Sequence, residues 1–403
     1  MVKSEEPRAD KTVLVIGGGK WQCPLIEKAK DMKYTVIAAD INPAAPGRNI
    51  SDRFVTIDTN DRDGLLKIAK ENKVSFVLTD QTDRTVPVMA YINAKLGLNG
   101  ITPEIAERFT DKFVMRTALV NAGVPLPRFK EISTREDALE TFESWQMPVI
   151  IKPKASQSSF GVFKIDRPEQ IDACWTETVK FSSDGKILIE EFVDGTEITV
   201  ESIVVNKKCD ILAISEKCHF PFNPCVAFKL SYPPRFSQDL IGKIGTVHKK
   251  IVSILELVDG ISHAEYRIRN ETPFLVEIAA RGGGNGITSV IVPHVSGIDV
   301  YKLLIKRIAG TDVCVDNLKN RAAILEFFDF RPGLVRRIEG VERAISEGFA
   351  ARLELNFKEG DVIKMPVSDA SRVGYFITLG NTRDDVDSKA NRVKELVKIH
   401  YTE

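Results

Sequence analysis

The chain has 403 residues, which is too long for one ordinary hydrophobic core, so two or three domains are expected. Hydrophobic residues make up 43% of it and charged residues 28%, the balance of a soluble globular protein. Because 56 basic side chains balance 56 acidic ones, the charge gives no reason to expect a nucleic acid or an anionic membrane as partner. No apolar run approaches the roughly 20 residues of a membrane span.

The N-terminus and the cysteines indicate the compartment. Residues 1–10 are charged and carry no apolar signal core, and we interpret them as a frayed tail. The six cysteines include no C-x-x-C pair, in a chain large enough not to need disulfides. Cys218, His219 and Cys225 lie near one another, but their spacing matches no closed zinc site and favours ordinary thiols. We therefore expect a cytoplasmic protein.

The first part of the chain alternates short β-rich runs with helical patterns. Strands are expected at 13–16, 34–40 and 74–78, with helices up to about residue 30 and at 61–71. This alternation predicts a parallel sheet with crossover helices. We expect this N-terminal α/β domain to cover residues 1–102.

A second part, residues 103–194, combines connecting helices with a compact α+β segment. One helical pattern runs from Pro103 to Ala122 and stops at a glycine followed by prolines, which is a strong helix terminator. Strands are then expected at 149–152, 162–165 and 187–190.

The third part, residues 195–403, is a larger α+β region. Its expected elements are strands at 197–205, 211–217, 261–268 and 274–280, helices at 238–257 and 299–308, and, after residue 321, a strand, a helix, two strands and a closing helix at 384–399. Residues 216–230, with His219 and nearby prolines, are interpreted as a loop that either faces the substrate or serves as a structural crossover.

A glycine run after the first strand invites a dinucleotide-binding interpretation. Gly17-Gly18-Gly19 follows the strand, and Asp40 ends the next one, about where a ribose-binding acid would lie. The run lacks the third glycine of G-x-G-x-x-G, however. A tight strand-to-helix turn explains it equally well, and we disfavour a nicotinamide-dependent enzyme.

Two acidic residues fall on facing positions of an expected β-hairpin. If residues 270–272 form the turn, residue 269 pairs with residue 273 and Glu265 lies directly opposite Glu277. Two carboxylates so placed lie about 5 Å apart and repel each other. A divalent cation between them would turn this repulsion into a binding site, and oxygen-only ligands suit magnesium.

The alternative is two solvated glutamates on an exposed hairpin, and the pattern alone does not separate the two interpretations. The run Arg281-Gly282-Gly283-Gly284-Asn285-Gly286 favours the metal site. A cation followed by backbone that is free to approach a ligand is what a phosphoryl or acyl-phosphate site requires.

Two further segments have features of a nucleotide site. Lys152 closes a strand, and the small residues of 155–161 that follow leave backbone N–H groups free to cover phosphates, although such loops are also common as plain hairpin connections. The other segment, 187–197, is an apolar strand that ends in two acids, turns at Gly195 and enters a strand led by a third acid.

In their order along the chain these motifs resemble the ATP-grasp superfamily. They are Lys112 after Thr110-Asp111, Lys152 with Ser-Phe-Gly, Glu190-Glu191-Phe192-Val193, Glu197, Glu265, and Glu277 with Arg281. The resemblance covers nearly the whole chain and implies an ATP-grasp fold with an N-terminal parallel-sheet (pre-ATP-grasp) domain, a central lid and a C-terminal α+β domain. The pattern at 373–380, followed by Asp384-Asp385 and a helix, resembles the last domain of the L-amino-acid ligase subgroup.

The resemblance implies that ATP lies between the lid and the C-terminal domain. It assigns Lys112 and Lys152 to the phosphates, and Ser158, Ser159 and Gly161 to the flexible lid loop. Glu190, Glu191 and Val193 are assigned to the adenine, and Glu197 to the ribose. At the adenine, the main chain of Glu191 and Val193 would form the hydrogen bonds, and Glu190 would lie beside the base.

The same resemblance gives Glu265 and Glu277 as ligands of Mg²⁺, or of Mn²⁺, and Arg281 as the catalytic residue that stabilises charge on the transferred phosphoryl group and the tetrahedral intermediate. It implies an ATP-dependent ligase that activates a carboxylate as an acyl phosphate, joins it to an amine and releases ADP and phosphate. The implied partners are small-molecule carboxylates and amines, amino acids or their derivatives. A homodimer is usual for similar proteins.

The chain departs from the superfamily pattern at Ala279, where Asn is common. Alanine cannot bind a metal ion, so one ion loses a ligand unless water replaces it. Two alternatives therefore stay open. One is a bicarbonate-using ligase of the purine-pathway or biotin-carboxylase kind, which shares the ATP machinery. The other is an ATP-binding protein without chemistry, for which Ala279 is the only support.

Overall fold

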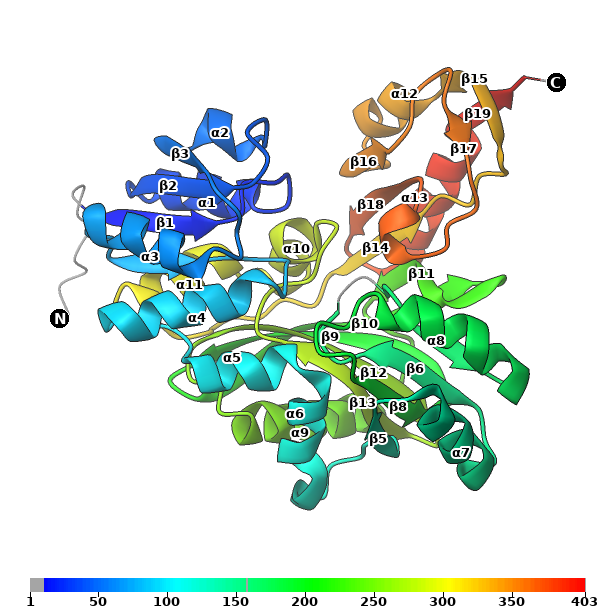
Figure 1. Ribbon diagram of the computed structural model, residues 1–403. Helices are drawn as coiled ribbons and strands as arrows, with labels where there is room; N and C mark the ends of the chain where they lie inside the picture. Colours follow the sequence, from blue (N-terminus) through cyan, green and yellow to red (C-terminus); the bar gives the residue numbers. More distant parts are fainter. Residues whose placement is uncertain (1–10, 157–158, 403) are drawn as a thin grey trace.

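The strands of the protein are grouped in separate sheets (Figure 1). The computed structural model describes residues 11–156 and 159–402, so the N-terminal tail and Ser158 lie outside the described residues. Within that part of the chain the sheets have four, eight, three and four strands. One sheet is parallel and the others are antiparallel, which agrees with the predicted mixture of α/β and α+β regions. The exact domain boundaries stay predictions.

The N-terminal sheet is parallel, as predicted, with the strand order β3-β2-β1-β4. Its elements are β1 (Thr12–Ile16), α1 (Cys23–Asp31), β2 (Thr35–Asp40), α2 (Gly47–Ile50), β3 (Arg53–Thr56), α3 (Arg62–Glu71), β4 (Phe76–Leu78) and α4 (Thr85–Leu96). Four of the five β1 residues are fully buried, as expected for a parallel strand covered on both faces.

The glycine run after β1 forms a turn that Asp40 closes. Gly17 has a φ of 101°, a backbone conformation that favours glycine. The Gly18 N–H donates to Asp40 Oδ2 over 2.7 Å, and the Asn42 N–H donates to Asp40 Oδ1 over 2.9 Å. The Asp40 carboxylate is thus engaged by the backbone, which supports the structural interpretation of these glycines over dinucleotide binding.

The helical pattern of 103–122 is two helices, so the prediction of one continuous pattern was wrong. The elements are α5 (Pro103–Thr110), α6 (Lys112–Leu119) and the 3₁₀ turn η1 (Val120–Ala122). The Asp111 carboxylate accepts from the N–H groups of Phe113 and Val114, so it caps a new helix. This cap places Lys112 at the first residue of α6, pointing toward the lid.

The lid is a four-stranded antiparallel sheet of order β5-β8-β6-β7 with two helices packed against it. Its elements are β5 (Phe129–Ile132), α7 (Arg135–Trp145), β6 (Val149–Pro153), β7 (Phe163–Ile165), η2 (Pro168–Gln170), α8 (Ile171–Val179) and β8 (Ile187–Glu191). Lys152 lies on β6, and Glu190 and Glu191 end β8, so the two segments singled out in the sequence are neighbours across one strand pair.

The eight-stranded central sheet, of order β13-β12-β9-β10-β11-β14-β18-β16, is antiparallel throughout. Its strands are β9 (Thr196–Val205), β10 (Lys208–Phe220), β11 (Asn223–Tyr232), β12 (Gly260–Arg269), β13 (Thr272–Ala279), β14 (Ala322–Phe327), β16 (Arg352–Leu355) and β18 (Gly374–Gly380). Helix α9 (Gln238–Ile254) packs against one face of this sheet. Residues 216–230 are the hairpin of β10 and β11, so the loop prediction was wrong.

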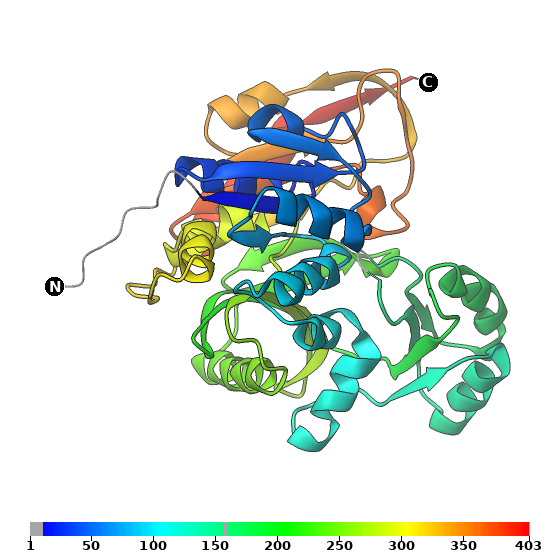
Figure 2. The ribbon, with the colours of Figure 1, turned by 60° about the vertical axis from the view of Figure 1, so that its left-hand side comes forward.

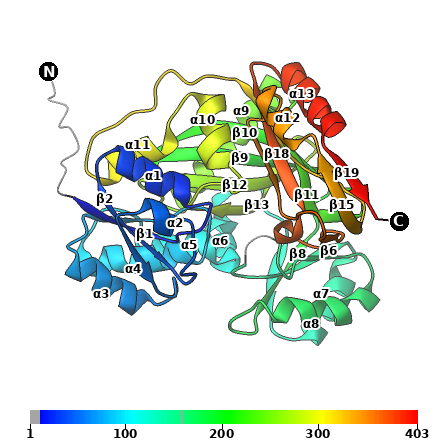
Figure 3. The same ribbon diagram turned by 90° about the horizontal axis from the view of Figure 1, so that it is seen from above.

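In Figure 2 the N-terminal sheet and the C-terminal elements both lie in the upper part of the molecule, and Figure 3, seen from above, shows them at opposite ends. The remaining elements are η3 (Ile287–Ile291), α10 (Val292–Ser296), α11 (Val300–Ile308), β15 (Gly333–Glu339), α12 (Val341–Ser346), β17 (Val362–Ile363), η4 (Asp369–Ser371), α13 (Arg383–Leu396) and β19 (Lys398–Tyr401). Strands β17, β15 and β19 form the three-stranded sheet.

No single helix among the described residues is long and apolar enough to cross a membrane. Only the bent pair Ile287–Ser296 and Val300–Ile308 passes that test together, by length and composition, with an angle of 103° between its halves. Both halves contribute buried residues to the largest hydrophobic core.

Candidate active site

Three adjoining cavities run from the lid to the junction of the N- and C-terminal parts. The lid cleft, with about 840 Å³ of empty space, is lined by the strands of the lid and of the central sheet. An inner cavity adjoins it, and Ser159, Lys217, Glu265 and Glu277 line both. An outer cavity shares Arg372 and neighbouring residues with the inner one. Of the sequence-predicted site residues that the structure describes, all but Gly161 line one or both of the first two cavities.

Glu265 and Glu277 lie directly opposite each other on β12 and β13, as predicted, but for a different reason. The turn is tighter than expected, because only Asn270 and Glu271 form it, with φ of 50° and 56°. This shifts the pairing by one residue, and a β-bulge next to Glu265 shifts it back. The exposed-hairpin alternative is therefore wrong, since both carboxylates face the cavities.

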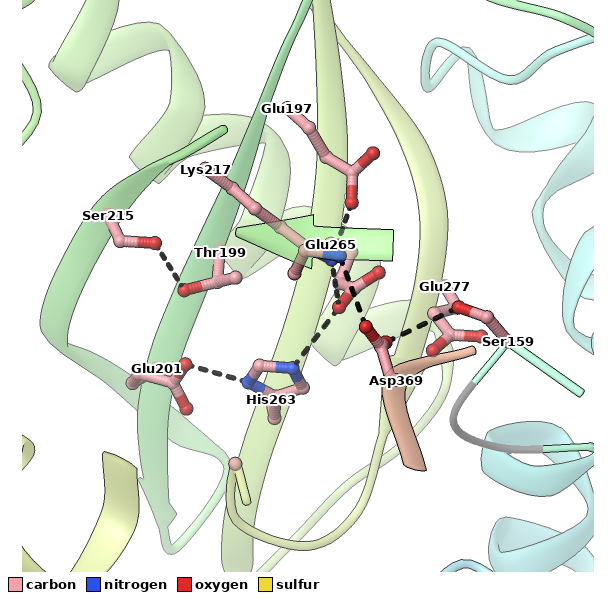
Figure 4. A network of polar contacts seen from close by, with 12 residues as sticks. Ser159, Glu197, Thr199, Glu201, Ser215, Lys217, His263, Glu265, Glu277 and Asp369 are labelled. Atoms are coloured by element: carbon pink, nitrogen blue, oxygen red, sulfur yellow. Dashed lines mark hydrogen bonds and ion pairs between the residues drawn. The ribbon is translucent and has the colours of Figure 1, made fainter. Parts of the chain in front are cut away.

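Glu265 is held by two cationic side chains (Figure 4). Lys217 Nζ lies 2.9 Å from Glu265 Oε1 and 2.6 Å from Glu197 Oε1, and His263 Nε2 lies 3.6 Å from the same Glu265 oxygen. Burial alone would raise the pKa of Glu265, but Lys217 and His263 lower it to about 2. The glutamates likewise raise the pKa of Lys217 against the effect of burial. Glu265 is therefore a carboxylate at neutral pH.

His263 is itself held by Glu201, whose Oε1 lies 2.7 Å from His263 Nδ1. Burial would lower the pKa of His263, but Glu201 and Glu265 raise it to about 9. Both contacts run along one face of the central sheet, because residues 201, 263 and 265 lie on adjacent strands with matched alternation.

Glu277 pairs with Lys112 from the start of α6, and Lys112 Nζ lies 3.0 Å from Glu277 Oε2. The same ammonium group donates to the Ser156 carbonyl oxygen in the lid loop over 2.8 Å. Burial would lower the pKa of Lys112, but Glu277 and Asp83 raise it. The structure thus brings Lys112 and Glu277 together, although they are far apart in the sequence.

Lys152 is buried beside Glu190, with 2.5 Å between Nζ and Oε2. Burial is the largest cause that lowers the pKa of Lys152. The fully buried Arg116 binds Glu190 Oε1 through Nε over 2.8 Å and donates through Nη2 to the Val276 carbonyl oxygen in the bulge over 2.6 Å. One arginine therefore joins the lid, α6 and the hairpin that carries Glu277.

The residues expected around adenine and ribose line the lid cleft as well. The Glu191 N–H donates to the Arg128 carbonyl oxygen over 2.9 Å, so this group is engaged inside the protein. Val193 is buried and lines the cleft. Glu197 contacts Lys217, His219 and Arg267. Burial would raise the pKa of Glu197, but these three neighbours hold it well below its ordinary value.

Arg281 lines the inner cavity and forms a two-pronged ion pair with Asp83 of the N-terminal part. Its Nε and Nη2 donate to Asp83 Oδ1 and Oδ2 over 2.8 and 3.1 Å. The next residue, Gly282, donates its N–H to the buried Asp80 over 2.7 Å. The glycine run is thus tied to the loop after β4.

The lid loop contacts the far end of the chain. Ser159 has a φ of 59°, and its Oγ donates to the Cys225 carbonyl oxygen over 3.0 Å and to Asp369 Oδ2 over 3.3 Å. At Gly161 the φ of 69° and the nearby Phe181 ring leave no room for a side chain. Ser158, which the sequence assigns to the same loop, lies outside the described residues.

Sequence reasoning missed three residues that line these cavities, Lys217, Asp369 and Arg372, and it also missed Asp83, the partner of Arg281. Arg372 is buried, lies 2.9 Å from Asp369 Oδ1 and stacks over the Phe327 ring at 3.5 Å from its centroid. Lys217 ends the predicted strand 211–217, but its pairing opposite Glu197 and its contact with Glu265 depend on the strand order, which the sequence does not give. The other three come together only through tertiary contacts.

The donor set at Glu265 and Glu277 fits a magnesium ion. Among the residues that the structure describes, no group of three or more His, Cys, Asp or Glu side chains could hold a metal ion. Mg²⁺ is commonly bound by one or two carboxylates, with substrate phosphates and water completing its shell. Two facing carboxylates meet that requirement.

Known proteins share this architecture. Residues 145–289 match the model of the ATP-grasp domain, and residues 326–402 match the L-amino acid ligase C-terminal domain 2. The L-arginine-specific L-amino acid ligase of Bacillus subtilis is 21% identical over 84% of this chain and 83% of its own length. A formate-dependent phosphoribosylglycinamide formyltransferase of Vibrio cholerae is 21% identical over 96% and 97%.

Among solved structures, an L-amino acid ligase from Bacillus licheniformis superimposes with a TM-score of 0.84, at 21% identity, over 98% of this chain and 99% of that one. The chain therefore carries an ATP-grasp domain at 145–289 and an L-amino acid ligase type C-terminal domain at 326–402. It is an ATP-dependent ligase of the carboxylate–amine family. The predicted fold and enzyme class are confirmed.

Proposed function

We propose that the protein activates a small carboxylate with ATP as an acyl phosphate, joins it to an amine, and releases ADP and phosphate. The observation that carries this proposal is the facing pair Glu265 and Glu277, with Lys112 on one side and Arg281 two residues beyond the strand. This arrangement gathers charged side chains where the lid cleft meets the inner cavity, and a bound nucleotide and ion could replace their present ion-pair partners.

ATP would lie in the lid cleft with its phosphates toward the inner cavity. Lys112 and Lys152 would contact the phosphates, and the main chain around Glu191 and Val193 would hold the adenine. Because the Glu191 N–H is engaged by Arg128, we expect the carbonyl oxygen of Glu191 and the N–H of Val193 to serve the base. Glu197 would exchange one of its cationic partners for the ribose hydroxyls.

Glu265 and Glu277 would hold Mg²⁺, or Mn²⁺, and the ion supplies charge neutralisation on the phosphates when it is bound. Their present partners, Lys217 and Lys112, carry their ammonium groups on flexible four-carbon stems, which could turn toward the phosphates. Ligand binding would then replace one set of ion pairs by another, with little net burial of charge.

The protein's own task in the reaction is positioning and neutralisation of charge. A free carboxylate is a poor electrophile, and phosphorylation gives it a good leaving group. Arg281 would leave Asp83 to stabilise the phosphoryl group and then the tetrahedral intermediate formed by the attacking amine. The lid loop, held by Asp369 through Ser159, would exclude the water that hydrolyses acyl phosphates.

Amino acids or their derivatives are the substrates we propose, supported by the C-terminal domain match and the similarity to L-amino acid ligases. The inner and outer cavities, which meet at Arg372, have room for the acid and the amine. A homodimer and a cytoplasmic location are part of the same proposal, and the six free thiols fit a reducing compartment.

The test is phosphate release across a matrix of acids and amines, with mass spectrometry of the products. We expect release only with a matching acid and amine, and an amide product at the sum of their masses less water. Bicarbonate-dependent release without an amine would instead support the carboxylating alternative. Tight ATP binding without ADP release over the whole matrix would support a protein without chemistry.

A further inference from the structure

Ala279, the residue that departs from the superfamily pattern, lies directly opposite His263. The two are paired across β13 and β12, on the strand face that also carries Glu265 and Glu277. Directly opposite side chains in an antiparallel pair have Cβ atoms about 5 Å apart. The imidazole of His263 therefore stands beside the space into which a longer side chain at position 279 would extend.

The position of His263 is determined on two further sides. Glu201, which is 3% exposed, holds Nδ1 at 2.7 Å. The backbone of Gly283 passes so close that a Cβ atom there would lie 3.0 Å from Nδ1. His263 is 8% exposed, and its ring is fixed between a carboxylate and a glycine backbone.

The other ring nitrogen of His263 faces Glu265. Nε2 lies 3.6 Å from Glu265 Oε1, the oxygen that also receives Lys217 at 2.9 Å. Within the described part of the chain, both of these cationic side chains contact Oε1, and neither contacts Oε2. The carboxylate is therefore anchored through one oxygen, and the other is left for an ion shared with Glu277.

We propose that His263, held by Glu201, is a positioning residue that orients Glu265 and offsets the ligand that Ala279 lacks. It acts through Glu265 and does not itself bind the ion. Outer partners that orient a ligating carboxylate commonly change metal affinity by about 10- to 100-fold. The proposal rests on the assignment of Glu265 and Glu277 as metal ligands in the proposed function.

The first experiment measures Mn²⁺ binding by electron paramagnetic resonance, with and without a non-hydrolysable ATP analogue. We expect His263→Asn to weaken Mn²⁺ binding about 10-fold or more, because Asn can reach Glu201 but not Glu265. His263→Gln, which keeps an N–H near the position of Nε2, should recover most of that loss. The matched control is His294→Asn, because His294 Nε2 donates to the Gly380 carbonyl oxygen away from the cavities.

The second experiment supplies the missing ligand. Ala279→Asn alone should lower Mn²⁺ affinity, because the new side chain competes with the imidazole for space. In the His263→Ala background, the same Asn has room to extend, and it should restore affinity at least several-fold over His263→Ala. Such sign-changing coupling is the signature of two neighbours that share one role.

The outcomes separate this proposal from the proposed function. Mn²⁺ affinity in folded His263→Asn equal to that of the unmodified chain would overturn the positioning role and leave the ligase assignment standing. If His263→Asn does not fold, Glu201→Gln is used, and it should weaken Mn²⁺ binding several-fold by freeing the ring; unchanged affinity would again overturn the role. If the unmodified chain binds neither the analogue nor Mn²⁺, the proposed function itself fails.

Discussion

The two faces of the central sheet differ in chemistry, although alternate residues of the same strands form both of them. On β9 and β12 the part of one face that lines the cavities carries charged or hydroxyl side chains, and farther along the strands the same face carries the core residues Ile203, Val205 and Ile261. The opposite face carries apolar side chains with a few serines and a tyrosine. The cavity-face residues are Glu197, Thr199, Glu201, His263, Glu265 and Arg267. The opposite face packs on α9.

Two buried histidines show what this difference means. His263 on the cavity face lies between two glutamates, and its pKa is raised to about 9. His248 on α9 lies 2.8 Å from Tyr266 Oη and 3.0 Å from Ser202 Oγ. Burial lowers the pKa of His248 to about 3, because these partners carry no charge. Two buried histidines thus have opposite protonation states, because His263 has charged neighbours and His248 has neutral hydrogen-bond partners.

The comparison separates ligand binding from stability. The cavity face holds charges in pairs that an incoming nucleotide and ion can exchange, so its side chains are available for chemistry. The opposite face holds a neutral hydrogen-bond network in which each group is satisfied by another buried group, so its side chains contribute to stability only. Substitutions on the two faces should therefore have effects of different kinds.

The largest effect is expected on the cavity face from Glu277→Gln. Loss of one of two facing carboxylates should lower ADP formation about 100-fold or more, since charge neutralisation on the phosphates supplies several kcal/mol in such reactions. The melting temperature should stay within a few degrees of the original. Steady-state ADP release and thermal unfolding measure the two quantities.

The control for Glu277→Gln is Glu271→Gln in the turn of the same hairpin, where the side chain is exposed and pairs with Lys243. Its ADP formation should be unchanged. If Glu277→Gln also left ADP formation untouched, the metal assignment would be wrong and the cavity face would have no special role in the reaction.

The part of the cavity face that the sequence predicts is the part that strand alternation controls. Because side chains alternate along a strand, the motif around Glu265 and the motif around Glu277 each place their residues on one face. Even here, the predicted pairing of Glu265 with Glu277 was right only because two features cancel: the turn is one residue shorter than predicted, and a bulge adds one residue back. Neither leaves a clear pattern in the residues.

What the sequence does not predict depends on contacts between distant segments. The Arg281–Asp83 pair joins residues 198 positions apart, and Ser159 meets Asp369 across 210. No local periodicity encodes these distances. The hairpin at 216–230 was missed because prolines and a glycine-free turn resembled an irregular loop, so the predicted strand 211–217 was too short. Tertiary pairing overrides local signals at such places.

A second effect, of intermediate size, is expected from pH on the opposite face. His248 is neutral in the fold, with a pKa of about 3 against an ordinary value of 6.5. Below pH 6.5 the unfolded chain binds a proton that the folded chain does not, so stability is complete above pH 6.5 and falls toward pH 3. Between pH 6.5 and 4.5 this linkage costs about 2–3 kcal/mol.

His248→Gln removes that titration. The melting temperature of the original protein should fall more steeply from pH 6.5 to 4.5 than that of the variant, and the difference between the two curves isolates the histidine from the carboxylates that titrate in the same range. Parallel curves would show that His248 is already protonated in the fold, which would remove the contrast with His263.

The smallest effect is expected from Ser262→Ala, which removes the 2.7 Å hydrogen bond between the Ser262 and Ser202 hydroxyls on the opposite face. Ser202 keeps its contact with His248, so the loss should be about 1 kcal/mol, seen as a small shift in the midpoint of urea unfolding. The matched substitution is Ser215→Ala, which removes the 2.7 Å hydrogen bond to Thr199 at the inner cavity. Both should cost similar stability, but only Ser215→Ala should lower the rate of ADP formation, since Thr199 faces the site. A fall in that rate with Ser262→Ala would mean that the two faces are coupled through the sheet, and the separation between ligand binding and stability would have to be abandoned.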